Sequence, residues 1–202
     1  MIYVVGLGPG NEDYLTEEGK RAILASTVLI GGKRNLESFK DFEGEKIELG
    51  NNLSEVVAYM RAHKEEKTIC VIASGDPLIY GIGKYLLSQF DKEELMIIPG
   101  ISAIQYFFSK IPLDMNDLYI TSSHGKQPDF NKILAMEKVA MVTDKVIGPS
   151  EIAEEIIKRN LSKVLWIGEN LSYEDEKVTK ARPEEIVGRK FQMNVVVIVD
   201  EK

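Results

Sequence analysis

The feature of this sequence that most constrains its fold is a series of short, β-branched apolar runs separated by amphipathic stretches. Few polar residues interrupt the runs, as is typical of strands buried on both faces of a parallel sheet. Between them, apolar residues recur with helical spacing over residues 53–60, 79–90 and 152–157. Strands that alternate with helices predict an α/β fold. The runs are Ile2–Val5, Thr27–Ile30, Thr68–Ala73, Leu95–Ile98, Leu118–Thr121, Val139–Val142, Val164–Ile167 and Val195–Val199.

The chain is long enough for one large domain or two small ones, at 202 residues. Its pattern changes near Ile111-Pro112, where regular β-α repeats with short loops end. A polar stretch at residues 174–177 then indicates a hairpin or an edge strand. We therefore expect an N-terminal α/β domain over residues 1–112 and a C-terminal α/β domain over residues 113–202.

Composition excludes several classes of function. The 25 Lys and Arg against 32 Asp and Glu give a net charge of −7, which argues against a protein that mainly grips nucleic acid. The single cysteine, Cys70, excludes an internal disulfide and a cysteine zinc site. No signal peptide or membrane span is evident, and no metal-ligand cluster stands out, so we expect a soluble, cytoplasmic protein without a metal.

Three loops rich in small residues follow predicted strands: GLGPG at residues 6–10, SGDPLIYG at 74–81 and PGISA at 99–103. In an open α/β sheet, ligands bind beyond the carboxyl ends of the strands. The first loop has G-x-G-x-G spacing rather than the G-x-G-x-x-G of dinucleotide sites, and Pro9 has no amide to offer a phosphate. These features make nucleotide phosphate binding the least favoured of three interpretations, the others being a plain tight turn and a loop that lines some other ligand.

Each remaining motif has a plain structural alternative. Asp76 could accept hydrogen bonds from ribose hydroxyls or merely cap a helix that begins near Pro77, and Ser102 offers the same choice. His124 stands among small polar residues and could exchange a proton near neutral pH, or lie in a surface loop without a role. Lys33 and Arg34 form either a solvated helix start or an anion contact.

Taken together, the three loops resemble the tetrapyrrole (corrin/porphyrin) methylase family, with order and spacing that agree across essentially the whole chain. Within it, GGKRNLESF at 31–39 and SSHGK at 122–126 are similar to the branch that methylates C5 of cobalt-precorrin-7 in cobalamin biosynthesis. The resemblance implies two α/β domains with S-adenosylmethionine (SAM) in the cleft between them, and a homodimer. It implies no decarboxylating C15-methyltransferase activity, which would then belong to a separate protein.

The resemblance also assigns roles to individual residues. Lys126 stands where this branch is expected to carry Arg, which leaves the carboxylate contact there less defined. Expected SAM contacts are Pro9, Ser74, Gly75, Asp76, Ile79, Ser102, Ala103, Thr143 and Leu171. Expected substrate contacts are Gly8, Lys33, Arg34, Ser122 and Lys126.

The implied chemistry needs few catalytic groups, because SAM carries an activated methyl group and leaves as S-adenosylhomocysteine. Orientation and exclusion of water are then the protein's main contributions. His124 is the candidate base for the proton lost after methylation. Two alternatives stay open: a sister methylase acting at another corrin position, or on a protein or RNA, and a non-enzymatic nucleotide-binding module.

Overall fold

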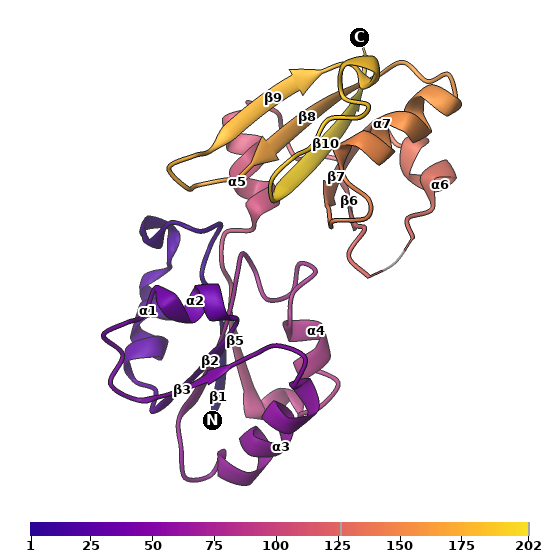
Figure 1. Ribbon diagram of the computed structural model, residues 1–202. Coiled ribbons are helices and arrows are strands. Elements are labelled where there is room, and N and C mark those ends of the chain that lie inside the picture. The colour runs from indigo at the N-terminus through magenta and orange to yellow at the C-terminus, as the bar shows by residue number, and fades with distance from the viewer. Residues whose placement is uncertain (126, 202) are drawn as a thin grey trace. The chain divides into compact units, whose positions relative to one another are not determined.

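A computed structural model describes residues 1–125 and 127–201 (Figure 1). The chain forms two compact units, Met1–Ser102 and Ala103–Lys202, each built on one five-stranded sheet. The predicted α/β class is confirmed. The division comes earlier than the expected boundary at residues 112–113, because helix α5 (Ala103–Lys110) packs on the second sheet. There the Phe107 ring lies so close to Gly168 that a Cβ on that glycine would be 2.8 Å away.

The first unit has an all-parallel sheet in the order β3-β2-β4-β1-β5. The three central strands are apolar and, apart from the half-buried Tyr3, fully or nearly fully buried, as the unbroken runs predict. The strands are β1 (Ile2–Gly6), β2 (Val28–Gly31), β3 (Glu45–Glu48), β4 (Ile69–Ala73) and β5 (Leu95–Ile98).

Helices cover both faces of this sheet. On one face α1 (Glu17–Leu24) and α2 (Lys33–Glu37) pack through Ile23 and Leu36 onto Val5 and Ile72. On the other face α3 (Leu53–His63) and α4 (Gly83–Leu86) pack through Met60 and Leu86. Short 3₁₀ turns lie at Glu12–Tyr14 (η1) and Lys92–Glu94 (η2).

The second unit has a mixed sheet in the order β6-β7-β10-β8-β9. Helices α6 and α7 and the turn η3 pack on one face, and α5 packs on the other. The elements are β6 (Tyr119–Ser122), α6 (Phe130–Leu134), β7 (Lys138–Val142), α7 (Pro149–Lys158), β8 (Lys163–Glu169), β9 (Lys177–Ala181), η3 (Pro183–Glu185) and β10 (Asn194–Asp200).

Two expectations about secondary structure differ from the structure. The helical pattern over residues 79–90 yields only the short α4, because Tyr80 adopts a left-handed backbone with φ of 54° that no α-helix accommodates. The unbroken run of β10 suggested a parallel strand, yet β10 is antiparallel to both β7 and β8. An unbroken apolar run therefore indicates that a strand is buried on both faces, and does not indicate its direction. Within residues 1–125 and 127–201, no helix is long and apolar enough to cross a membrane.

Candidate active site

The three small-residue loops of the first unit lie side by side. They follow β4, β1 and β5, which are neighbours in the parallel sheet, so all three emerge from its carboxyl edge. We call them the first loop (residues 6–10, after β1), the second loop (74–81, after β4) and the third loop (99–102, after β5). The sheet thus gathers the site residues that the sequence predicted in these loops, except Ala103, which begins α5 of the second unit.

Glycines bring the loops into direct backbone contact. A Cβ on Gly6 would lie 2.5 Å from the Gly100 nitrogen, and one on Gly100 would lie 2.2 Å from the Gly75 oxygen. Gly8 has a φ of 85° and pairs with Gly75 through two backbone hydrogen bonds, of 3.3 and 2.7 Å. Both backbone polar groups of Gly8 are used in this pair, and its positive φ favours glycine at this point of the loop.

Asp76 joins the second loop to the third. Its Oδ1 accepts a hydrogen bond from the Leu78 amide (2.8 Å), and its Oδ2 accepts one from the Gly100 amide (3.3 Å). The helix-cap alternative does not hold, because α4 begins only at Gly83. A carboxylate has about four acceptor sites, so Asp76 keeps capacity for a ligand donor.

The rim of these loops is partly apolar. Leu78 and Tyr80 are 53% and 50% exposed, and Ile101 in the third loop is 37% exposed. Pro9 and Ser102 are buried, whereas Ile79 and Ala103 are half-buried.

The cation pair also lies at the carboxyl edge of the first sheet. Lys33 and Arg34 begin α2, directly after β2, and both are exposed. From the same helix, Asn35 accepts a hydrogen bond from the Ser74 hydroxyl (3.0 Å), which ties α2 to the second loop. The pair therefore lies at the same edge of the sheet as the second loop.

In the second unit, β6, β7 and β8 point the same way, so their carboxyl ends share one edge. This edge carries Ser122, His124, Thr143 and Leu171. Thr143 donates from its hydroxyl to Asn194 Oδ1 (2.8 Å). Leu171 is buried against Gly168, which leaves its backbone as the part able to contact a ligand.

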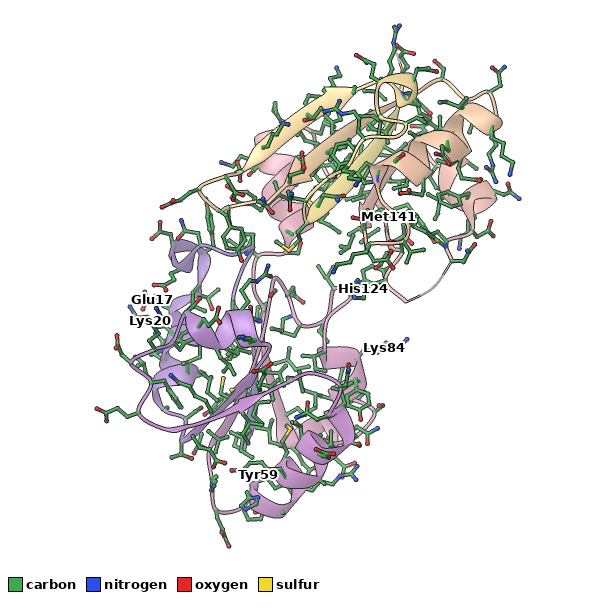
Figure 2. The ribbon with its side chains drawn as sticks, viewed as in Figure 1. Glu17, Lys20, Tyr59, Lys84, His124 and Met141 are labelled. Atoms are coloured by element: carbon green, nitrogen blue, oxygen red, sulfur yellow. The ribbon has the colours of Figure 1, made fainter. Side chains whose placement is uncertain are left out.

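His124 is exposed on the loop that follows β6 (Figure 2). Its backbone amide donates to the buried Ser122 hydroxyl (3.0 Å). Ser122 thus stabilises the loop from inside. The remaining predicted substrate contact, Lys126, lies outside the described residues.

The sequence analysis missed Asp144, which follows β7 at this same edge. Hydrogen bonds from the Ile147 and Val146 amides lower the pKa of its carboxyl below the ordinary value, against partial desolvation. The Gly125 amide and the charge of His124 act in the same direction. The Thr-Asp pair after a predicted strand was a usable signal, because Asp at a strand end commonly accepts from nearby amides.

Other chemically distinctive groups lie elsewhere. Burial raises the pKa of the Cys70 thiol, in the middle of β4, to about 12, so it stays protonated and unreactive. Among the residues that the structure describes, no group of His, Cys, Asp and Glu side chains is arranged to hold a metal ion.

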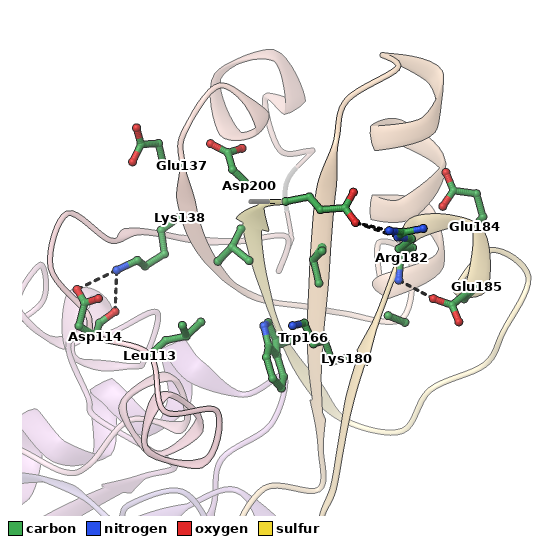
Figure 3. Close-up of a pocket in the computed structure, with 14 residues that line it drawn as sticks. Leu113, Asp114, Glu137, Lys138, Trp166, Lys180, Arg182, Glu184, Glu185 and Asp200 are labelled. Carbon is green, nitrogen blue, oxygen red and sulfur yellow. Dashed lines mark hydrogen bonds and ion pairs between the residues drawn. The ribbon is translucent and has the colours of Figure 1, made fainter.

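A depression of about 1390 Å³ opens in the second unit (Figure 3). It lies where β7 and β8 begin and β10 ends, at the edge opposite to His124. Several of its charges are paired, as in Lys138 with Asp114 (2.9 Å) and Arg182 with Glu201 (2.7 Å). This position and pairing separate it from the predicted site.

Loops at the carboxyl edges of α/β sheets are where such folds bind their ligands. Sequence comparison identifies the enzyme family. The tetrapyrrole (corrin/porphyrin) methylase family matches residues 1–187, so the chain belongs to that family.

Two relatives are similar along their whole length. The cobalt-precorrin-7 C(5)-methyltransferase of Salmonella typhimurium is 43% identical over 203 residues, covering 100% of both chains. A probable cobalt-precorrin-7 C(5)-methyltransferase of Methanocaldococcus jannaschii is 32% identical, covering 99% of this chain and 98% of the relative. Among solved structures, uroporphyrin-III C-methyltransferase of Thermus thermophilus, in complex with S-adenosylhomocysteine, superposes with a TM-score of 0.81 at 18% identity. That comparison covers 98% of this chain and 96% of the other.

Proposed function

We propose that this protein transfers the methyl group of SAM to C5 of cobalt-precorrin-7, or of its metal-free analogue, in cobalamin biosynthesis. The observation that carries the proposal is the 43% identity, from end to end, to a methyltransferase named for this carbon. The fold alone would not select the substrate, since the Thermus enzyme has the same fold and a different tetrapyrrole in its name.

The first unit fits a bound SAM. Its three loops approach one another so closely at Gly6, Gly75 and Gly100 that added side chains would displace the backbone. Glycine at these positions lets the three loops pack together at the edge where an adenosyl group is proposed to bind. The proposed SAM contacts in this unit are Pro9, Ser74, Gly75, Asp76, Ile79 and Ser102, and those in the second unit are Ala103, Thr143 and Leu171.

Bound SAM supplies an electrophilic methyl group on a sulfonium sulfur. The loops hold and orient it, and thereby replace a bimolecular encounter by a fixed approach. In such a transfer the bond from sulfur to the methyl carbon would break as the bond to C5 forms, and C5 would then have to lose a proton. His124 is our proposed acceptor for this proton, because it is exposed on a loop at the carboxyl edge of the second sheet and an imidazole ring nitrogen can accept a proton.

Substrate carboxylates require cations, and the acidic chain must concentrate them locally. Lys33 and Arg34 stand at the carboxyl edge of the first sheet, beside the second loop. Arg34 suits paired hydrogen bonds to a carboxylate, whereas Lys33 acts as a point charge. Gly8, Ser122 and Lys126 complete the proposed substrate contacts.

The resemblance to the family further supports a homodimer, which sedimentation velocity can test. It also supports a location in the cytoplasm. Relatives matched from end to end carry C(5) alone in their names. We therefore assign the decarboxylating methylation at C15 to a separate protein.

The decisive experiment uses SAM with a ¹³C-labelled methyl group. Incubation with cobalt-precorrin-7, and separately with the metal-free compound, should give a product whose label is bonded to C5 by NMR. Label on another corrin carbon would support the sister-methylase alternative. Binding of SAM, NAD and ATP, compared by thermal shift, tests the nucleotide-binding alternative, which requires NAD or ATP to stabilise the protein more than SAM does.

A further inference from the structure

The loops after β6 and β7 are joined by a small polar network. Ser123, which is buried, donates from its hydroxyl to the Ile147 carbonyl (3.0 Å) and accepts from the Asp144 amide (3.1 Å). The Ser123 amide donates to the Val142 carbonyl (3.0 Å). The chain on either side of Ser123 is thus fixed to the loop that starts at Thr143.

Asp144 holds this second loop in shape. Its Oδ1 accepts from the amides of Val146 and Ile147, both at 2.8 Å, which closes a turn immediately after β7. The same turn presents the Ile147 carbonyl to Ser123. Removing the carboxylate would therefore release both ends of the contact between the loops.

The carboxylate of Asp144 also faces the loop that carries His124. The Gly125 amide and His124 are both close enough to favour its ionised form. Gly125 has a φ of 68° and nothing packs within 4 Å of where its Cβ would be. An open, glycine-containing loop is costly to hold in one conformation, so an anchor from outside the loop matters.

We infer that Asp144 is a positioning residue that fixes the segment 122–125, and with it His124, for the proton transfer. The inference rests on the proposed role of His124 as proton acceptor. Asp144 acts through Ser123 and through the backbone of the His124 loop. It thereby gives a function to a side chain that the motifs of the family resemblance did not include.

Two variants separate geometry from charge. Asp144→Ala removes the acceptor, and we expect kcat to fall about 10- to 100-fold, while the Kd for SAM stays within about twofold. Asp144→Asn keeps an oxygen that accepts from both amides, and should retain kcat within about threefold. Asp114→Ala is the matched control. Asp114 likewise accepts from an amide two residues ahead (2.9 Å), but it lies at the opposite edge of the sheet, so activity should not change.

Hydrogen exchange tests the anchoring without relying on catalysis. In Asp144→Ala, amides of the described residues 122–125 should exchange faster, whereas those of β8 and β10 should not. Unchanged exchange in the loop would overturn the inference. Faster exchange throughout the second unit, with a lower Tm, would overturn it too, because Asp144 would then support the fold in general.

A double-mutant cycle tests the route through His124. If Asp144 acts by positioning His124, Asp144→Ala should cost almost nothing in a His124→Ala background. Independent, additive losses would overturn that route. A fully active His124→Ala enzyme would instead refute the proposed role of His124, and loop exchange in Asp144→Ala would still show whether the anchor exists.

Discussion

The carboxyl edges of the two sheets are built in opposite ways. In the first unit, three loops contact one another through bare backbone at Gly6, Gly75 and Gly100. In the second unit, the corresponding loops are joined by side chains, chiefly those of Ser123 and Asp144. The structure of the first edge therefore depends on the space between its loops, and that of the second edge depends on hydrogen bonds. Substitutions should accordingly fail for different reasons in the two units.

The largest effect is expected for Gly100→Ala. The new Cβ would lie 2.2 Å from the Gly75 oxygen and 2.7 Å from the Gly6 carbonyl carbon, both of which are backbone atoms. We expect a stability loss of about 1–3 kcal/mol, as is usual for overpacking, together with loss of measurable SAM binding by calorimetry. Gly32→Ala is the control, because nothing lies within 4 Å of its Cβ position. A Gly100→Ala protein that binds SAM normally would show that the loops separate readily.

The next effect concerns Asp76, whose side chain joins the second loop to the third in the first unit. Asp76→Ala should weaken SAM binding by about 1–3 kcal/mol, because an acceptor for the ligand and for the Gly100 amide is lost together. Asp76→Asn keeps an acceptor for Leu78 and isolates the contribution of charge. If calorimetry gives the wild-type Kd for both variants, Asp76 only ties the loops.

A smaller effect is expected when Lys33 and Arg34 are both changed to alanine. The substrate KM should rise several-fold, while the Kd for SAM stays within about twofold. Added salt should raise the wild-type KM more steeply than that of the variant, since screening weakens the same attraction. The matched control changes Lys20 and Arg21 to alanine, which removes two exposed cations from α1. If KM depends on salt equally in the wild type and the variant, Lys33 and Arg34 are solvated surface residues that do not bind the substrate.

The contrast between the edges also explains what the sequence could predict. Each glycine-containing loop is one short stretch of sequence. The motifs at 6–10, 74–81 and 99–103 could therefore be recognised, and they identified the first edge and its strands. The second edge depends on β6 and β7 being neighbours, which brings Ser123 to Asp144 across the intervening α6. The Thr-Asp pair after β7 was a local sign of a turn, but no local pattern shows the contact between Asp144 and Ser123.

Edge strands show the same limit of local patterns. The strand β3 is mostly exposed and reads as a polar stretch, so it was not predicted, and only its pairing with β2 makes it a strand. The polar stretch at 174–177 did indicate an edge, and β9 begins at Lys177. The central strands could be predicted because a strand buried on both faces has a continuous run of apolar residues.

The smallest expected effect is a difference in stability at acid pH between the wild type and Asp144→Asn. Its pKa is lowered in the folded protein, chiefly by the Ile147 and Val146 amides, so the unfolded chain binds its proton more readily. The stabilisation is present above the ordinary carboxyl pKa and is lost as pH falls through the lower, folded value. Between pH 6 and pH 3, the wild type should therefore lose slightly more stability than Asp144→Asn. Fluorescence of Trp166, the single tryptophan, follows urea unfolding of the second unit.

Salt distinguishes this contribution from that of an ion pair. The pKa of Asp114 is also lowered, but first by its hydrogen bond from Lys138, so Asp114→Asn should show a difference of the same sign. In 1 M NaCl the screening length is about 3 Å, and the Asp114 difference should shrink. The Asp144 difference should persist, because its main partners are neutral backbone amides. If salt removes both differences equally, charge rather than hydrogen bonding holds the second edge, and the contrast between the two units is weaker than the geometry indicates.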